Sequence, residues 1–534
     1  MNIKNKFKIT DFPLIIIILE ILFIIYMNTL KCAAYPELDM AKLYRHAIEM
    51  VRNGSIVIDG WNYITTMELD CSLLLALPFY AITKNIYISF GISNIIFMFV
   101  YVFIFYDILC KINVKRIYKY ISVILLLIPY RMGMLEYFNM MFYNGGQYVI
   151  KVLVPLILID LLFEDEEMLL KPKNIILTIL MVILMVITSM SSGSYVLISG
   201  ILPVMLGYAL NILMSGNLAN IRVKKLALFG IVFAAFIAGY IMCIALNVHP
   251  NSEGMDLVAP NALVENIFVT IWGYFSVFLS NDSVGVLSVS GINQLIRYAI
   301  AGIIILVVIY NIRNMFKPGE EEDKKRILVM PFVITLIILC LTRVCFGDVY
   351  YPERYFFIGV IPMFLTVPYF LDAIEKNAVN SLTGNVYMGL IAVAVLVLIP
   401  LCVFDVRAEI RNGYEGGYRG VYEVMDYARE NGIENVFWLY NLPDGEVARL
   451  VEPDIKSTVI NFKDEEAVLD EVRDFYLAAN SPSYYTGANL LLEKSGSGDF
   501  ERMQDNVKAS YTEIGVIGGY VAYMSDACVF DSMN

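Results

Sequence analysis

Four of the six carboxylates in the stretch after the first apolar run are the residues best suited to acid–base chemistry. They are Asp39, Asp59, Glu68 and Asp70. An ionised carboxylate within reach of a hydroxyl group can act as a general base. Each also has an ordinary structural role, as a helix cap, a first-turn acid or a turn residue. The local sequence is compatible with both kinds of role.

Two cationic residues lie at the edges of apolar runs, where a charged side chain needs a partner. Arg354 precedes Tyr355 at the start of a late apolar run, and Lys151 lies just inside another run, after Tyr143. A guanidinium group suits bidentate binding of phosphate, and a lysine inside an apolar segment must snorkel or bind something. The alternative for Arg354 is an interfacial anchor. These positions are candidate phosphate-binding residues.

The composition is that of a membrane protein with a soluble part. The chain has 534 residues, of which 58% are hydrophobic and 17% are charged, and its mean hydropathy is +0.66. Soluble globular proteins are about 45–50% apolar and about 25% charged, which excludes an ordinary soluble enzyme. Residues 406–534 carry 11 Lys+Arg and 23 Asp+Glu and hold the whole net charge of -12. This acidic segment argues against nucleic-acid binding.

Eleven apolar segments approach the length of about 20 residues that a spanning helix needs. The predicted spans are 12–30, 86–109, 118–131, 147–163, 174–190, 194–213, 226–247, 296–312, 327–346, 355–372 and 386–404. The segment 262–281 has an apolar stripe and is predicted to form an interfacial or re-entrant helix. Two amphipathic helices, over 39–52 and 71–83, are predicted in the loop after the first span, the first of them along the membrane surface.

The short loops rich in Lys and Arg fall on the side of the N-terminus, which predicts a cytoplasmic N-terminus. Residues 1–405 are then a membrane domain with a first outer loop at 31–85, and residues 406–534 are an extracytoplasmic domain. This domain is predicted to be a small α/β domain with helices over 418–431, 444–451 and 464–475 and strands over 436–440, 457–462 and 511–524. The expected fold is a polytopic α-helical membrane protein that carries this domain at its C-terminus.

The order of these features resembles the GT-C superfamily of integral membrane glycosyltransferases, and within it the protein O-mannosyltransferases and bacterial aminoarabinose transferases. The resemblance rests on Asp39 just after the first span, a two-helix outer loop, the stretch 49–55, Arg354-Tyr355 opening a late span, and a C-terminal outer domain. The family often has paired acids after its early aspartate, whereas Met40 follows Asp39 here.

The resemblance implies a hexosyl- or pentosyltransferase of the cell envelope, with a GT-C-like fold. Such an enzyme moves a sugar from a polyprenyl-phosphate donor to an extracytoplasmic glycan, lipid or protein, with inversion at the anomeric carbon. Asp39 would be the general base, Arg354 would bind the lipid phosphate, and Glu68 and Asp70 would position the sugar or the acceptor. The remaining candidate substrate-binding residues are Asp59, Tyr143, Lys151 and Tyr355. The expected chemistry requires no cofactor, although the acids could hold Mg²⁺ or Mn²⁺.

Two other functions are compatible with the sequence. A transporter or lipid flippase often contains paired repeats with broken helices at the midplane, and here no repeat is seen and the polar residues gather at one face. A non-catalytic protein of envelope assembly would show the same features as a transferase, so the sequence leaves it open.

Overall fold

The computed structural model describes residues 12–532 except 59, 62, 64–65, 134–135, 216–221, 247–262, 280–284, 347–352, 378–380, 414–417, 464–465 and 470–483. The chain forms two compact units. The first unit is Met1–Leu30, Thr65–Leu74 and Phe90–Val406, and the second is Lys31–Ile64, Leu75–Ser89 and Arg407–Asn534. The second unit therefore contains most of the stretch between the first two apolar helices as well as the acidic C-terminal segment.

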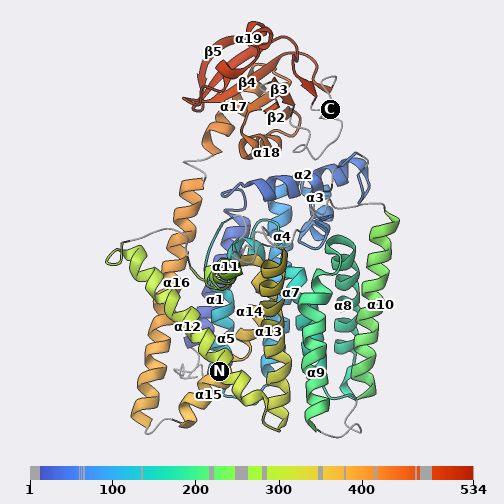
Figure 1. The fold of residues 1–534 in the computed structure, drawn as a ribbon, viewed down its shortest axis with the longest axis vertical. Helices are drawn as coiled ribbons and strands as arrows, with labels where there is room; N and C mark the ends of the chain where they lie inside the picture. The colour runs from blue at the N-terminus through green and yellow to red at the C-terminus, as the bar shows by residue number, and fades with distance from the viewer. Residues whose placement is uncertain are drawn as a thin grey trace, which may run out of the picture. The chain divides into compact units, whose positions relative to one another are not determined.

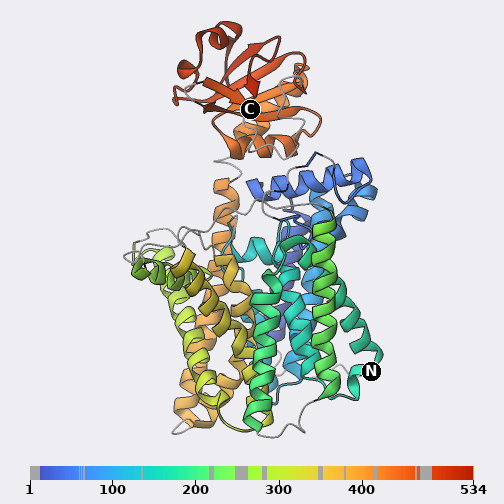
Figure 2. The ribbon, with the colours of Figure 1, turned by 45° about the vertical axis from the view of Figure 1, so that its right-hand side comes forward.

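The first unit is a bundle of helices, most of which run alongside one another (Figure 1; Figure 2). Its helices are α1 Phe12–Thr29, α4 Ile86–Cys110, α5 Arg116–Leu127, α6 Tyr137–Phe142, α7 Val149–Leu162, α8 Pro172–Ser192, α9 Leu202–Ser215, α10 Val223–Ala245, α11 Leu263–Ser276, α12 Val289–Met315, α13 Glu320–Phe346, α14 Phe357–Phe364, α15 Val367–Asn377 and α16 Ser381–Gly413. The first residues of α4 and the last of α16 belong to the second unit. The described part of the bundle also contains the short 3-10 helices Met168–Leu170 and Glu353–Phe356 and the π-helix Leu197–Ile201, which continues into α9.

A helix occurs at each of the eleven predicted spans, but fewer qualify as full spans. Among the described residues, seven helices are long and apolar enough to cross a membrane, or eight if the bent pair α14–α15 is one span. The helices α5 and α7 have 12 and 14 residues, which gives lengths of about 18 and 21 Å, short of the ~30 Å of a bilayer core. All residues of α7 are buried, as in a core helix.

Proline explains two of these differences between the prediction and the structure. The predicted span 118–131 ends early because Ile128, which precedes Pro129, adopts an extended conformation (φ -58°, ψ 127°) that stops α5. The predicted span 355–372 is divided by a 43° bend between α14 and α15. Pro368 near the start of α15 has no N–H to continue the hydrogen bonding of α14, which favours a break there.

The segment 262–281 was predicted to be an interfacial or re-entrant helix. Its described part forms α11, a helix of 14 residues that packs against α13. A helix of this length reaches about 21 Å and is too short to cross a bilayer alone. The structure therefore agrees with a helix that does not span.

The second unit contains α2 Leu38–Asn53, α3 Leu73–Thr83, α17 Arg419–Glu430, α18 Leu442–Val451 and α19 Asp505–Ser510. The first two residues of α3 lie in the first unit. Helix α2 is amphipathic as predicted, with its apolar side buried. The prediction of an amphipathic helix over 71–83 is wrong, because α3 is apolar along its whole length.

A mixed sheet forms the core of the C-terminal segment. Its strands are β1 Asn435–Leu439, β2 Lys456–Lys463, β3 Glu466–Leu469, β4 Asn489–Lys494, β5 Thr512–Ile517, β6 Tyr520–Ser525 and β7 Asp531–Ser532, in the order β5-β6-β4-β1-β2-β3-β7. The central strand β1 is parallel to β2 and β4, and α18 makes the crossover between β1 and β2. The predicted helix 464–475 is wrong where the structure describes it, because β3 forms there and pairs with β2.

Candidate functional site

In the first unit, a buried ion pair joins two of the predicted site residues, Asp70 and Lys151. Asp70 ends a stretch without regular secondary structure that is hydrogen-bonded to the C-terminal end of α8. The amides of Met67 and Leu69 donate hydrogen bonds to the carbonyl and the hydroxyl of Ser191, at 3.3 and 3.0 Å. Lys151 lies in the first turn of α7, 3.1 Å from the Asp70 carboxylate. The packing of this stretch on α8 therefore brings Asp70 to Lys151.

Both partners of the pair are removed from solvent, with exposed fractions of 1% for Asp70 and 8% for Lys151. The hydroxyls of Ser191 and Ser192 donate to the Asp70 carboxylate at 2.9 and 2.6 Å, and the Lys151 ammonium donates to the Gln147 carbonyl at 3.1 Å. A buried ion pair is tolerated only when such hydrogen bonds offset the loss of hydration. We call Asp70, Lys151, Ser191 and Ser192 the buried pair cluster.

Three tyrosine rings connect this cluster to the other predicted cation, Arg354. The Lys151 ammonium lies 4.9 Å from the centre of the Tyr148 ring. The ring centres of Tyr148 and Tyr195 are 6.1 Å apart, and those of Tyr195 and Tyr355 are 6.0 Å apart. The guanidinium of Arg354 lies 5.5 Å from the Tyr355 ring centre, and its charge acts on both Tyr148 and Tyr195. Two cations therefore flank one group of phenols, which we call the tyrosine group (Tyr148, Tyr195 and Tyr355).

This arrangement suits a ligand that carries a phosphate. Aromatic faces stabilise nearby cations, and a lysine and an arginine together can neutralise a phosphate and hydrogen-bond to its oxygens. The phenolic hydroxyls are further hydrogen-bond donors. Arg354 and Tyr355 lie in the short turn Glu353–Phe356 that leads into α14, so the start of this helix fixes their position.

The structure places the other predicted residues differently. Glu68 is half-buried next to Asp70 and has a left-handed backbone (φ 55°), and its carbonyl accepts a hydrogen bond from the Cys71 thiol at 2.9 Å. Tyr143 is 1% exposed and stacks on Phe138 with a ring distance of 5.9 Å, so it contributes to aromatic packing. Asp59 lies outside the described residues.

Asp39 lies in the first turn of α2, in the second unit. The cap of this helix is Glu37, whose carboxylate accepts hydrogen bonds from the amides of Asp39 and Met40 at 2.9 and 2.7 Å. The capping role considered for Asp39 is therefore performed by a neighbour. The carboxylate of Asp39 is half-buried and has the favourable environment that a helix N-terminus gives to an anion.

Four residues of the site were missed by the sequence interpretation, namely Ser191, Ser192, Tyr148 and Tyr195. The signal for the two serines was a mostly polar run, Ser189 to Ser194, between two apolar segments. Gly193 within this run has a φ of 60° and ends α8. A polar interruption between two spans indicates a helix break, but nothing local shows that its hydroxyls meet a carboxylate far away in the sequence.

His46 is packed in the second unit and has no role in the cluster described above. It is fully buried, its ring stacks on Trp61 at 4.7 Å, and its Nε2 lies 3.4 Å from the Tyr63 hydroxyl. Burial, reinforced by the nearby Lys42 ammonium, lowers the pKa of His46 from 6.5 to about 3. His46 is therefore neutral in the folded protein at physiological pH.

We predict that His46 makes the second unit less stable in mild acid. Between pH 6.5 and 3 the imidazole is protonated in the unfolded chain and neutral in the folded chain, so stability is present above pH 6.5 and is lost as the pH falls. The loss is about 1.4 kcal/mol per pH unit in this window. Thermal unfolding of the wild type and of His46→Gln from pH 7.5 to 5 tests this, and the variant should have the flatter pH profile. Equal slopes would contradict it.

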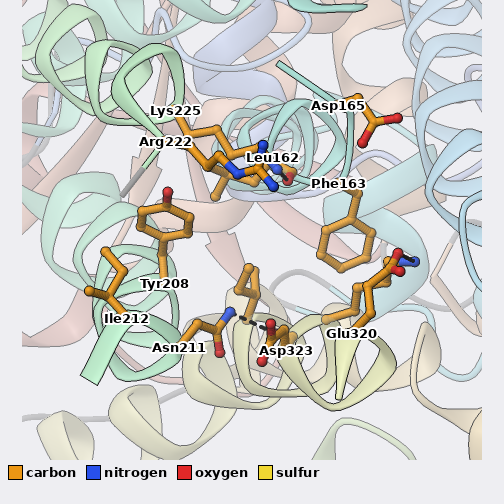
Figure 3. Close-up of a pocket in the computed structure, with 12 residues that line it drawn as sticks. Leu162, Phe163, Asp165, Tyr208, Asn211, Ile212, Arg222, Lys225, Glu320 and Asp323 are labelled. Carbon is orange, nitrogen blue, oxygen red and sulfur yellow. Dashed lines mark hydrogen bonds and ion pairs between the residues drawn. The ribbon is translucent and has the colours of Figure 1, made fainter. Parts of the chain in front are cut away.

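A cavity lies in the first unit and is lined by none of these residues (Figure 3). It has a volume of about 400 Å³ and is lined by residues of α9, α10 and α13 and of the end of α7, with three cationic and three acidic side chains among them. Asn211 donates to the Asp323 carbonyl at 3.1 Å, and Lys324 pairs with Glu320 at 3.1 Å. Since the lining charges balance, the cavity has no evident preference for either sign of ion.

The described part of the chain contains no group of three or more His, Cys, Asp or Glu side chains that could hold a metal ion. Of the four acids considered for Mg²⁺ or Mn²⁺, Asp70 is engaged with Lys151 and two hydroxyls. Asp59 lies outside the described residues. Among the described residues, these acids do not form a group that could hold a metal ion.

Neither a protein-family model nor a curated protein matches the chain. Among solved structures, it is similar to the archaeal oligosaccharyltransferase AglB from Archaeoglobus fulgidus in complex with an inhibitory peptide and a dolichol-phosphate. The identity is 12%, the match covers 96% of this chain and 74% of that chain, and the TM-score is 0.47. It is also similar to the Archaeoglobus fulgidus oligosaccharyltransferase in complex with Zn and sulfate, with 11% identity, 95% and 73% coverage and a TM-score of 0.47. Similarity at this level does not assign a function to the chain.

Proposed function

We propose that this protein is a membrane glycosyltransferase that moves a sugar from a polyprenyl-phosphate donor to an extracytoplasmic glycan, lipid or protein. The observation that supports this most is the pair of cations, Lys151 and Arg354, on either side of the tyrosine group in a helical membrane unit. A lipid donor presents its phosphate at the membrane boundary. Binding of this phosphate requires cations and hydroxyl groups in fixed positions. Lys151, Arg354 and the phenols of the tyrosine group are side chains of these types.

In this proposal Lys151 and Arg354 bind the phosphate of the donor and stabilise it as the leaving group. Negative charge grows on the phosphate as its bond to the anomeric carbon breaks. Cations that are already in place stabilise that charge without reorganisation. The low exposure of Lys151 strengthens its interaction, because little water competes with it.

Asp39 is the proposed general base. Its carboxylate takes the proton of the acceptor hydroxyl while the oxygen forms a bond to the anomeric carbon. The bond between that carbon and the phosphate oxygen breaks, and its electron pair leaves with the polyprenyl phosphate. Attack from the side opposite the phosphate inverts the anomeric centre. A base of this kind contributes about 10²–10⁴-fold to a rate.

The remaining predicted residues have supporting roles in this proposal. Asp70 positions the Lys151 ammonium, because its carboxylate is already engaged by that ammonium and two serine hydroxyls. Glu68 and Asp59 position the sugar or the acceptor, and Tyr355 orients Arg354. Tyr143 supports the aromatic packing beside the site. The Lys and Arg distribution favours a cytoplasmic N-terminus and an extracytoplasmic C-terminal domain.

The direct test is release of free polyprenyl phosphate from a panel of polyprenyl-phosphate sugars by the purified protein in detergent. We expect release by the wild type and a loss of about 100-fold or more in Arg354→Ala, since a donor to the developing charge is removed. Arg354→Lys should retain part of the activity, because it keeps the charge and loses the bidentate geometry.

The matched control is Arg313→Ala, which removes an exposed arginine in the last turn of α12 and should leave release unchanged. Full activity in Arg354→Ala would remove Arg354 from the site. If the protein cleaves no donor in the panel when a mixture of glycan, lipid and peptide acceptors is present, the result would favour a non-catalytic protein of envelope assembly over a transferase.

A further inference from the structure

The second unit contains a cavity between α2 and the C-terminal segment. It has a volume of about 320 Å³ and is lined by one side of α2, by the end of α18 and by the start of β2. Helices α2 and α18 pack against each other, and both views show them as neighbours (Figure 1; Figure 2). The volume is at the lower end of the range for small-molecule sites, about 300–1,000 Å³.

The lining of this cavity is basic. Its charged side chains are the cations Arg45, Arg52, Arg449 and Lys456 and the acids Glu49 and Asp454. Residues 406–534 have 11 Lys+Arg against 23 Asp+Glu. Two of these cations, Arg449 and Lys456, nevertheless line this one cavity together with Arg45 and Arg52 of α2. We call this cavity the basic pocket. Its excess of cations selects for an anion.

Two of the cations are held firmly in the wall. Arg449 is 4% exposed, its Nε donates to the Ser457 carbonyl at 2.5 Å, and it forms an ion pair with Glu446. Lys456 donates to the Tyr484 carbonyl at 2.5 Å and lies 4.5 Å from the centre of that ring. Their positions are therefore set before any ligand arrives, which lowers the cost of ordering them on binding.

The third cation has a partner that a ligand can replace. Arg52 pairs with Asp454 and with Glu49, each at 3.1 Å, and the side chains of Arg52, Asp454 and Glu49 are 44%, 92% and 20% exposed. Exposed pairs of this kind contribute at most about 1 kcal/mol. A phosphate or carboxylate on a ligand can form a bidentate bond with the guanidinium in place of Asp454.

We propose that the basic pocket binds a small organic anion that carries a phosphate or a carboxylate group. Arg52 and Lys456 bind the anionic group, and Arg449 contributes its charge from the wall. This binding site lies in a different unit from the tyrosine group and does not depend on transferase activity. The measurement below is of binding alone, so its outcome is separate from the outcome of the donor assay.

The test uses the full chain in detergent with three probes of one sugar skeleton: glucose 6-phosphate, glucuronate and glucose. Thermal unfolding is measured against probe concentration at constant ionic strength. We expect the unfolding temperature to rise with at least one charged sugar and to stay constant with glucose. The charged probe with the lower Kd identifies the anion class. No rise with either charged sugar would overturn the proposal.

Variants separate binding in the pocket from binding elsewhere. Arg52→Gln combined with Lys456→Gln should raise the Kd about tenfold or more, whereas Arg502→Gln, an exposed arginine of the same segment outside the pocket, should not change it. Asp454→Asn should lower the Kd, because it removes one of the two internal anions that compete for Arg52. Tighter binding by Asp454→Asn could not be explained by a loss of stability in that variant. A wild-type Kd in the double variant, or weaker binding in Asp454→Asn, would overturn the proposal.

Discussion

Asp39→Asn is expected to lower the rate of sugar transfer by about 10²–10⁴-fold while the protein stays folded. The substitution keeps the size of the side chain and removes the negative charge that is proposed to accept the proton. Its structural effect should be small, because Glu37 and not Asp39 caps α2. The loss of a favourable charge in the first turn of a helix costs about 0.3–1 kcal/mol. The measurement is the turnover of a polyprenyl-phosphate sugar and an acceptor, beside an unfolding curve for the same preparation.

The matched control for this prediction is Asp505→Asn. Asp505 also lies in the first turn of a helix, α19, and its side chain is fully exposed. The control repeats the same chemical change in the same unit and should leave turnover unchanged. Turnover of Asp39→Asn within about threefold of the wild type would show that the base is another residue, and Glu68 and Asp59 would then be the next acids to replace.

The sequence was sufficient to locate the helices, because apolar runs of this length are strong signals. It was less informative about which of them are long enough to span. Pro129 is surrounded by apolar residues, so the predicted span extended to residue 131, although α5 ends at Leu127. The helix predicted over 464–475 failed for a different reason. Residues 466–469 are placed in a strand by pairing with β2, and such tertiary contacts override local preference.

The candidate site was predictable as residue types and not as an arrangement. Lys151 and Arg354 were identified because a charge at the edge of an apolar run is costly without a partner. Their partners were not identified, because Asp70 and Tyr195 come from distant parts of the chain. Only the packing of residues 66–70 on the end of α8 shows that Ser191 and Ser192 bind the Asp70 carboxylate.

The second large effect is expected from Lys151→Met, which should destabilise the first unit by about 3–5 kcal/mol. The variant leaves the Asp70 carboxylate, only 1% exposed, without its counter-ion. Removal of one partner of a buried pair has this cost because the remaining charge has lost its hydration and gained no substitute. Thermal unfolding in detergent measures the change. Lys115→Met is the control, since the pair of Lys115 with Glu375 is exposed, with fractions of 57% and 39%, and contributes at most about 1 kcal/mol.

Combining Lys151→Met with Asp70→Asn separates the structural role of the pair from its chemical role. The double variant has no buried charge, and an asparagine oxygen can still accept hydrogen bonds from the serine hydroxyls, so most of the lost stability should return. Transfer should remain low, because the ammonium that we propose binds the phosphate is still missing. If transfer returned together with stability, Lys151 would serve only to neutralise Asp70, and the phosphate would depend on Arg354 alone. If Lys151→Met were as stable as Lys115→Met, the buried pair itself would be in question.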